Sequence, residues 1–374
     1  MINKPLPIGV DDFGKMISNH YYFVDKTLLI KELLDKKGDV NLFTRPRRFG
    51  KTLNMSMLQY FFEDRRDENG NSMDNRSLFQ NLKIMDCGEN YLQYMGKYPV
   101  IALSLKSAKQ EDFEQSFAAL TDDIAGEFTR HAFLLESDCL TEYMKKKYRA
   151  LMEDAAKRTD YNKSLKFLSE CLHRYYGHKA VILIDEYDVP LESAYFSKYY
   201  NKMEGFIRSL FESALKTNPH MEFAVITGCL RISKESVFTG LNNLKMISIL
   251  DSRYDEYFGF TDAEVQTICR DYGVEEKFGI LQKWYDGYLF GKTNVYNPWS
   301  VIQYMDELKE NREAFPKPYW ANTSSNDIVR RFIESADRET RNEIEALIEG
   351  KTIEKPVHED ITYEEIWLFR GNSG

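Results

Sequence analysis

The segment that most constrains the fold of this chain is NLFTRPRRFGKTLN, residues 41–54. Gly50, Lys51 and Thr52 follow an apolar stretch, residues 40–43, that is typical of a short buried strand. A strand, a loop ending in Gly-Lys-Thr and a helix together form the context of a phosphate-binding loop. The predicted helix after the loop shows apolar residues at the spacing of one face, namely Leu53, Met57, Leu58, Phe61 and Phe62.

In such a loop, backbone N–H groups at the start of the helix bind phosphate, the lysine adds a positive charge, and the Ser/Thr hydroxyl binds Mg²⁺. We predict Lys51 and Thr52 in these roles. Arg45 stands where the standard loop has its first glycine, which usually relieves backbone strain there. Taken alone, the remnant RRFGKT is equally compatible with a basic turn that caps a helix.

A second segment, KAVILIDEYDVP, predicts an apolar strand that delivers Asp185 and Glu186 at its carboxyl end. In phosphate-loop ATPases an aspartate there holds Mg²⁺, and a following glutamate activates the attacking water. Because ligands of open α/β sheets bind beyond the carboxyl ends of the strands, we expect this pair beside Lys51. An acidic turn after a buried strand is the alternative, but both segments in this order favour ATP and Mg²⁺ binding. Asp188 is predicted to cap the next helix.

A third segment, VITGCLRIS, ends another predicted strand. Thr227 is either a sensor that orients the attacking water or an ordinary hydroxyl at a strand end. Arg231 is either a catalytic cation, acting in its own subunit or across to a neighbour, or one half of a surface salt bridge. The predicted catalytic residues are therefore Glu186, Thr227 and Arg231, and the predicted metal ligands are Thr52 and Asp185. The predicted nucleotide-binding residues are Arg47, Arg48, Phe49, Gly50, Lys51 and Thr52.

The rest of the chain alternates strand-like and helix-like periods, which predicts an α/β fold with a largely parallel sheet. Further strands are expected near residues 99–105, 222–227 and 246–250. After about residue 255 the pattern changes to short helices, with Thr261 and Glu264 spaced as a capping box and Asn297-Pro298 as a helix start. The stretch WYDGYLFG is interpreted as a turn packed by aromatic rings. We predict a core at 1–255, a helical lid at 256–345 and a tail at 346–374.

Composition narrows the classes of protein. The 374 residues are 43% hydrophobic, which is ample for a sizeable core. The net charge of −9 argues against a nucleic-acid-binding surface over the whole protein, although the basic cluster Arg45, Arg47, Arg48 and Lys51 could touch nucleic acid locally. The five scattered cysteines, together with the lack of an apolar signal or membrane span, predict a cytoplasmic protein.

Several segments resemble the bacterial AAA-ATPase-like family. Those that carry the resemblance are RPRRFGKT, LIDEYDVPL, ITGCLRISKESVFTGLNNLK, PLPIGVDDFGKMISNHYYFVDKT, FGFTDAEV, WYDGYLFG, VYNPWSV and YWANTSSND, across residues 5 to 345. The loop of that family is similar in having arginines where the standard loop has its first glycine. The resemblance implies an AAA-like phosphate-loop ATPase core followed by a helical lid, with Lys51 and Thr52 on phosphate and Mg²⁺.

Members of this family often continue into a C-terminal nuclease-like domain of the PD-(D/E)XK type. Glu349-Gly350-Lys351 matches the second half of that motif, but the sequence shows no acidic strand before it. We therefore expect no nuclease activity and interpret the tail as the remnant of a lost domain. The main alternative to an ATPase is a nucleotide-gated module that binds a partner protein or nucleic acid with little turnover; a homo-oligomer is compatible with either.

Overall fold

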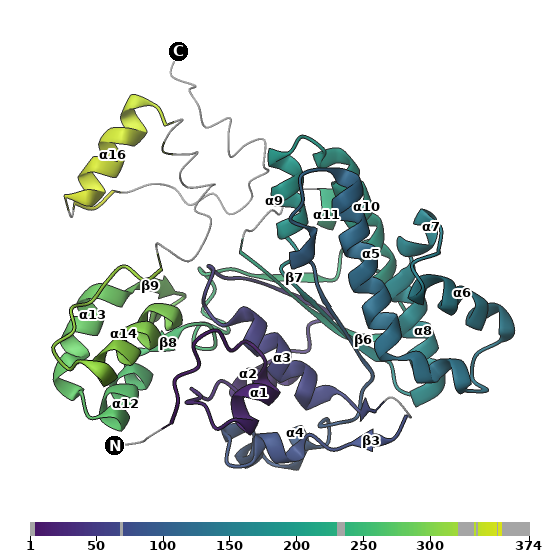
Figure 1. Cartoon of the computed structure of the whole chain (residues 1–374), viewed down its shortest axis with the longest axis horizontal. Coiled ribbons are helices and arrows are strands. Elements are labelled where there is room, and N and C mark those ends of the chain that lie inside the picture. Colours follow the sequence, from purple (N-terminus) through teal and green to yellow (C-terminus); the bar gives the residue numbers. More distant parts are fainter. Residues whose placement is uncertain are drawn as a thin grey trace.

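A computed structural model describes residues 4–67, 70–229, 236–320, 333, 336–349 and 351–353. Its centre is a five-stranded sheet, in the order β4-β5-β6-β1-β7, in which all pairs are parallel (Figure 1). This confirms the predicted α/β fold. The strands of this sheet are β1 (Val40–Thr44), β4 (Val100–Ser104), β5 (Ala180–Asp185), β6 (Met221–Gly228) and β7 (Leu244–Ile247).

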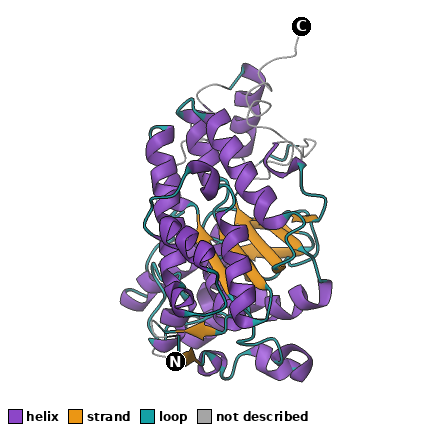
Figure 2. Ribbon diagram, turned by 90° about the vertical axis from the view of Figure 1, so that its right-hand side faces the viewer, coloured by secondary structure: helices purple, strands orange, loops and turns teal. Residues whose placement is uncertain are grey.

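Helices cover both faces of the sheet, so the strands are apolar on both sides (Figure 2). Along β1, Leu42 belongs to one hydrophobic cluster and its neighbour Phe43 to the other, as the two-residue period of a strand requires. The Phe43 side is covered by α1 (Phe13–Ser18), α2 (Leu28–Lys36) and α3 (Lys51–Phe62). The Leu42 side is covered by α5 (Phe113–Arg130), α8 (Ser164–Tyr176) and α10 (Tyr200–Leu215).

Shorter elements connect these layers or extend from them. None of the helices in the described ranges is both long enough and apolar enough to cross a membrane. The short helices and strands are β2 (Arg65–Arg66), β3 (Ser72–Met73), α4 (Glu89–Leu92), α6 (Glu142–Met152), α7 (Arg158–Tyr161), α9 (Val189–Phe196), α11 (Ser236–Thr239) and α16 (Arg338–Ile348). The 3₁₀ turns are η1 (Arg76–Phe79), η2 (Lys83–Cys87), η3 (Lys106–Ala108), η4 (Ala132–Glu136) and η5 (Glu275–Lys277).

A small α/β unit, residues 260–310, lies beside the core (Figure 1). It contains a three-stranded antiparallel sheet in the order β8-β10-β9. The predicted lid is thus not purely helical. The stretch WYDGYLFG, predicted as a turn, instead ends α13 and forms β9. The elements of the unit are β8 (Phe260–Thr261), α12 (Asp262–Tyr272), α13 (Phe278–Tyr285), β9 (Asp286–Phe290), β10 (Thr293–Tyr296) and α14 (Pro298–Glu310).

Both helix starts predicted in this unit are confirmed. The Thr261 hydroxyl accepts from the Glu264 backbone N–H, and the Glu264 carboxylate accepts from the Thr261 N–H, which forms the capping box of α12. The Asn297 side chain accepts from the Ser300 N–H at the start of α14, where Pro298 is the first residue of the helix. Local sequence therefore determines where these two helices begin.

The N-terminal segment joins the core to the small unit. The Tyr22 hydroxyl donates to Asp271 at 2.6 Å, and the buried Lys26 ammonium forms an ion pair with Glu264 at 2.6 Å. These contacts join the N-terminal segment, which lies before the predicted boundary at residue 255, to the small unit that lies after it. The segment therefore packs against both the core and the small unit. The boundaries near residues 255 and 345 stay predictions, and the part of the tail after residue 353 lies outside the described residues.

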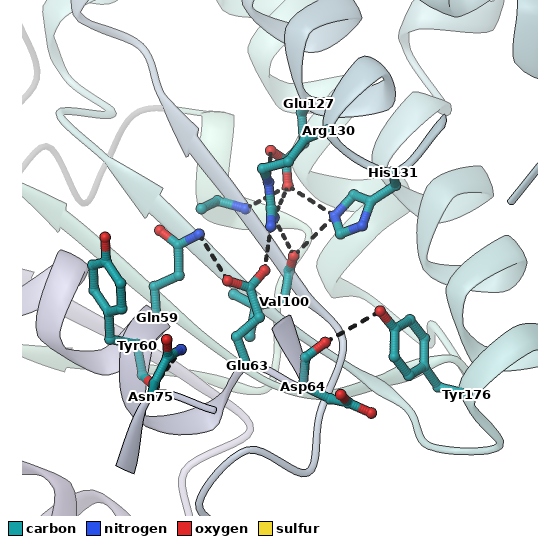
Figure 3. Close-up of polar contacts among 11 residues, drawn as sticks. Gln59, Tyr60, Glu63, Asp64, Asn75, Val100, Glu127, Arg130, His131 and Tyr176 are labelled. Carbon is teal, nitrogen blue, oxygen red and sulfur yellow. Dashed lines mark hydrogen bonds and ion pairs between the residues drawn. The ribbon is translucent and has the colours of Figure 1, made fainter. Parts of the chain in front are cut away.

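A buried polar network holds the start of β4 against the ends of two helices (Figure 3). Arg130, the last residue of α5, donates to Glu127 at 2.6 Å, to the Val100 carbonyl, and to Glu63 just beyond α3. The His131 ring contacts the same Val100 carbonyl at 3.2 Å. Each buried charge thus has an opposite partner, as burial requires. The network fixes the edge strand β4 beside β5, and so positions the loop that follows β4.

Candidate functional site

The predicted phosphate loop spans residues 45–50, between the end of β1 and the start of α3. Gly50 adopts a left-handed conformation (φ 81°) at the N-cap of α3, and Lys51 is the first residue of the helix. Arg48 is also left-handed (φ 70°), whereas Arg45 is not among the residues with positive φ. Position 45 therefore has no backbone strain that a glycine would relieve, and the positions of this loop with positive φ are 48 and 50.

Arg45 is a structural residue of this loop. Its side chain is fully buried and donates from Nη1 to the carbonyls of Thr44 and Ile247, each at 3.0 Å. The guanidinium lies 5.1 Å from the ring centre of Phe258 and 5.2 Å from that of Phe290, within the range of cation–π contacts. Burial lowers the pKa of Arg45 to about 10. Arg45 thus links β1 to β7 and the small unit, and it cannot belong to a surface basic cluster that contacts nucleic acid.

Lys51 is held by the loop itself. Its ammonium donates to the carbonyls of Arg45 and Pro46, each at 2.9 Å, and contacts the Cys229 sulfur at 3.3 Å. Only 6% of the lysine is exposed, so these carbonyls replace the water that a free ammonium would bind. These hydrogen bonds keep the positive charge of Lys51 against the backbone of the phosphate loop, at the N-terminus of α3.

Asp185 and Thr52, predicted as the two metal ligands, are in contact. The Thr52 hydroxyl donates to Asp185 Oδ2 at 2.6 Å. Asp185 Oδ1 accepts from the Thr227 hydroxyl and, at 3.0 Å, from the backbone N–H of Glu186. β5, β6 and β1 are neighbours in the sheet, which brings these residues to one carboxyl edge. The arrangement groups hard oxygen donors around one buried carboxylate.

Glu186 follows Asp185 directly, at the end of β5. Its backbone is left-handed (φ 56°), an uncommon conformation for glutamate that is often found at functional sites. Burial and the neighbouring Asp185 raise the pKa of the Glu186 carboxyl, while Lys106 and Lys51 act in the opposite direction. Asp188 occupies the N-cap position of α9, but the prediction that it caps this helix is wrong: its carboxylate accepts from the Cys229 N–H instead.

These residues line a cavity of about 1060 Å³. All six predicted nucleotide-binding residues contribute to its wall: Arg47, Arg48, Phe49, Gly50, Lys51 and Thr52. Glu186 also lines the cavity. Asp185 and Thr227 are buried and do not line it. The wall also includes apolar residues of the N-terminal segment and of α14, namely Phe23, Val24, Trp299 and Ile302.

The loop side chains between Arg45 and Gly50 point to different parts of the structure. Arg47 forms an ion pair with Glu192 on α9 at 3.0 Å. The Arg48 guanidinium lies 4.5 Å from the ring of Trp299 at the start of α14. Phe49 is buried, with its ring 4.8 Å from Tyr288 and 5.3 Å from Phe290 of β9. The loop therefore contacts both the core and the small unit.

Several residues of the wall were not predicted from the sequence. Lys106 and Lys109 come from the turn after β4, and Trp299 comes from the first turn of α14. The rule that ligands bind beyond the carboxyl ends of parallel strands could have identified Lys106, because it follows a strand that the sequence predicts. Trp299 had no such signal, since its place on the wall depends on how the small unit packs.

Two further predictions concern Arg231 and the Glu349-Gly350-Lys351 match. Arg231 lies outside the described residues. Glu349 and Lys351 form an ion pair with each other at 2.6 Å at the end of α16, a helix with no buried residues. The Glu-Gly-Lys match therefore begins at the end of a helix and does not follow an acidic strand.

Comparisons with known proteins relate this chain to one family. The chain is 28% identical over 331 residues to a protein of Azotobacter chroococcum mcd 1 described as "Uncharacterized protein in vnfD 5'region". The match covers 87% of this chain and 55% of the relative, so the chain spans about half the length of that protein. A family model described as "Predicted AAA-ATPase" matches residues 7–238, more than half of the chain, including the phosphate loop, Asp185, Glu186 and Thr227. The chain belongs to the AAA-ATPase-like family.

Proposed function

We propose that this chain binds ATP together with Mg²⁺ in the cavity and hydrolyses the ATP. The observation that carries the proposal is the 2.6 Å hydrogen bond between Thr52 and Asp185, with Glu186 next to it at the end of β5. It joins the end of the phosphate loop to the acidic end of a parallel strand two positions away in the sheet. Lys51 and the N–H groups at the start of α3 would bind the β- and γ-phosphates.

The donor set around Asp185 suits Mg²⁺. Thr52 offers a hydroxyl oxygen and Asp185 a carboxylate, and Mg²⁺ prefers such hard oxygen ligands together with water and phosphate. Thr52 would bind the ion directly, and Asp185 would hold it through water. When bound, Mg²⁺ would neutralise charge on the phosphates during transfer. Thr227 would keep Asp185 oriented through its hydroxyl.

Glu186 is the residue proposed to activate water. Its carboxylate would accept a proton from the water that attacks the γ-phosphorus, and ADP would leave with the bridging oxygen. The raised pKa of Glu186 brings this base closer to neutral pH than an exposed carboxylate, which makes proton acceptance more favourable. Arg231 is proposed to stabilise charge in the transition state, in the same subunit or from a second copy.

The direct test is phosphate release from ATP by the full chain, with and without Mg²⁺. Lys51→Ala should abolish nucleotide binding, and Glu186→Gln should bind ATP but retain it without turnover. Lys179, exposed at the start of β5 and so at the opposite end of the sheet, offers a control: Lys179→Ala should match the parent. Hydrolysis by both Lys51→Ala and Glu186→Gln at the parental rate would refute the assignment.

A nucleotide-gated binding module is the second candidate. It is favoured by the contacts that the phosphate loop makes with the small unit, through Arg45 and Phe49. In this case ATP binding would alter the position of the unit, which would contact a partner protein or nucleic acid, with little turnover. A single-turnover ATPase assay beside a nucleotide titration separates the two: binding without product in one turnover supports the module.

A further inference from the structure

The turn after β4 brings a lysine that no sequence motif identified to the phosphate end of the cavity. β4 pairs in parallel with β5, with Ser104 opposite Asp185, and the Leu105 N–H donates to the Asp185 carbonyl at 3.0 Å. Lys106 is the next residue, so its backbone leaves the sheet beside the Asp185–Glu186 pair. Its side chain lines the cavity.

The turn that carries Lys106 is anchored on both sides. The Ser107 hydroxyl donates to Asp123 of α5, and the Ser116 hydroxyl donates to the Ala108 carbonyl at 2.7 Å. The Gln110 carbonyl accepts from the hydroxyls of Ser193 and Tyr199, each at 2.9 Å. These bonds come from three separate helical regions, so the backbone around Lys106 is held in one place. A positioned lysine on a fixed turn is suited to contact a ligand.

The ammonium of Lys106 is available for such a contact. Within the described ranges, Lys106 Nζ makes no hydrogen bond or ion pair, and the residue is exposed on the wall of the cavity. Arg47, by contrast, is paired with Glu192, and Lys51 is held by loop carbonyls. Lys106 and Glu186 both line this cavity, and the residues directly before them are joined by the hydrogen bond from the Leu105 N–H to the Asp185 carbonyl. Lys106 is therefore on the same part of the wall as the carboxylate that would face the γ-phosphate.

We propose that Lys106 is a further catalytic residue of this site, which contacts the γ-phosphate of bound ATP from the β4 side. This inference rests on the proposed function. Lys51 would approach the phosphates from the end of β1, and Lys106 from the end of the edge strand β4. A lysine ammonium is a compact point charge that binds phosphate well. Lys106 would stabilise the negative charge that develops on the γ-phosphoryl oxygens, using a cation of the same chain.

The test compares ligands with and without a γ-phosphate. Affinities of the full chain for ADP and for the non-hydrolysable analogue AMP-PNP, both with Mg²⁺, are measured by calorimetry in the parent, Lys106→Gln, Lys106→Arg and the control Lys179→Gln. Lys106→Gln should weaken AMP-PNP binding by about tenfold, because a charge-assisted bond is lost. Its ADP affinity should stay within about twofold of the parent. Lys106→Arg should restore part of the AMP-PNP affinity, and the control should change neither ligand.

Turnover gives a second readout. Lys106→Gln should lower kcat by about a hundredfold at saturating ATP, as loss of one preorganised charge at a transition state does. Equal loss of AMP-PNP and ADP affinity, or no loss of either, would overturn the role of Lys106 while leaving ATP binding intact. If the parent binds neither nucleotide, the proposed function itself fails. An unchanged thermal unfolding midpoint in Lys106→Gln shows that the variant is folded.

Discussion

Thr52 and Asp185 are 133 positions apart in the chain, yet the Thr52 hydroxyl donates to the Asp185 carboxylate at 2.6 Å. The contact is possible because β1 and β5 flank β6 in one parallel sheet, so their carboxyl ends lie at the same edge. Asp185 has two further donors, the Thr227 hydroxyl and the Glu186 N–H. These two donors orient the Asp185 carboxylate even without Thr52. The hydroxyl oxygen of Thr52 can therefore bind a metal ion.

Replacing Thr52 tests this arrangement. Thr52→Ala should lower the Mg²⁺-dependent gain in ATP affinity by about 10- to 100-fold, because an oxygen ligand is lost. The free energy of unfolding should change by no more than about 1 kcal/mol, since Asp185 keeps two donors. Thr52→Ser retains the hydroxyl and serves as the matched control. The measurement is an ATP titration at several Mg²⁺ concentrations. An alanine variant with parental Mg²⁺ dependence would remove Thr52 from the metal site.

Arg45 provides the sharpest test of the unusual loop. Arg45→Gly restores the glycine of the standard phosphate loop, but position 45 does not need positive φ, and the buried side chain fills space between β7 and the small unit. The variant should therefore lose about 3 kcal/mol of stability or more, without gaining nucleotide affinity.

Arg45→Met is the matched variant, because it keeps most of the apolar volume and removes the charge. It should be less destabilised than Arg45→Gly in denaturant unfolding. Tighter ATP binding by the glycine variant at unchanged stability would mean that Arg45 obstructs the loop and does not support it.

The pH dependence of turnover should reflect Glu186. Burial and Asp185 raise its pKa, so the carboxylate becomes protonated, and the base inactive, at a higher pH than an ordinary glutamate would allow. We expect kcat to fall as pH decreases through this raised pKa. The measurement is kcat against pH at saturating ATP. Removal of the Lys106 charge should shift this limb to still higher pH, whereas Lys179→Gln should leave it in place.

The same pKa shift has a consequence for stability. A carboxyl whose pKa is raised in the folded state binds its proton more tightly there, so stability falls as pH rises through the interval between the unfolded and folded pKa values. Glu186→Gln removes this penalty and should raise the unfolding temperature at neutral pH. A lower unfolding temperature in this variant would show that the Glu186 charge is stabilised by its surroundings.

The network of Glu127 and Arg130 predicts the opposite pH dependence. Burial alone would raise the pKa of Glu127, but Arg130 and His131 outweigh it and lower the pKa from 4.5 to about 2. A lowered carboxyl pKa stabilises the fold above 4.5, and this stability is lost as pH falls towards about 2. Glu127→Gln should lose on the order of 3 kcal/mol at neutral pH and show a weaker acid dependence.

Urea unfolding at pH 7 and at low pH measures this difference. Glu136→Gln, at an exposed residue on the neighbouring η4 turn, is the control and should follow the parent at both pH values. Equal destabilisation of Glu127→Gln at both pH values would show that packing, and not the charge pair, accounts for the loss.

Much of the site was predictable because its key residues lie at the ends of strands that are visible in the sequence. Lys51, Thr52, Asp185 and Glu186 follow apolar runs, and strand geometry alone brings such positions to one edge of a parallel sheet. The turn predicted at residues 284–291 was wrong for a different reason. The alternation of exposed Leu289 and buried Phe290 has meaning only once β10 and Phe49 are in place beside them.

The sequence by itself determined the phosphate loop, the acidic strand end and the helix starts at Thr261 and Asn297, because each depends on residues close together in the chain. Only the tertiary structure decided what Arg45 and Lys106 do. In the sequence, Arg45 belongs to a basic cluster and Lys106 to an unremarkable turn. In the fold, Arg45 is buried between β7 and the small unit, whereas Lys106 lines the cavity beside Glu186. The difference comes from which elements pack against each residue, since packing determines whether a charge is buried or faces the ligand cavity.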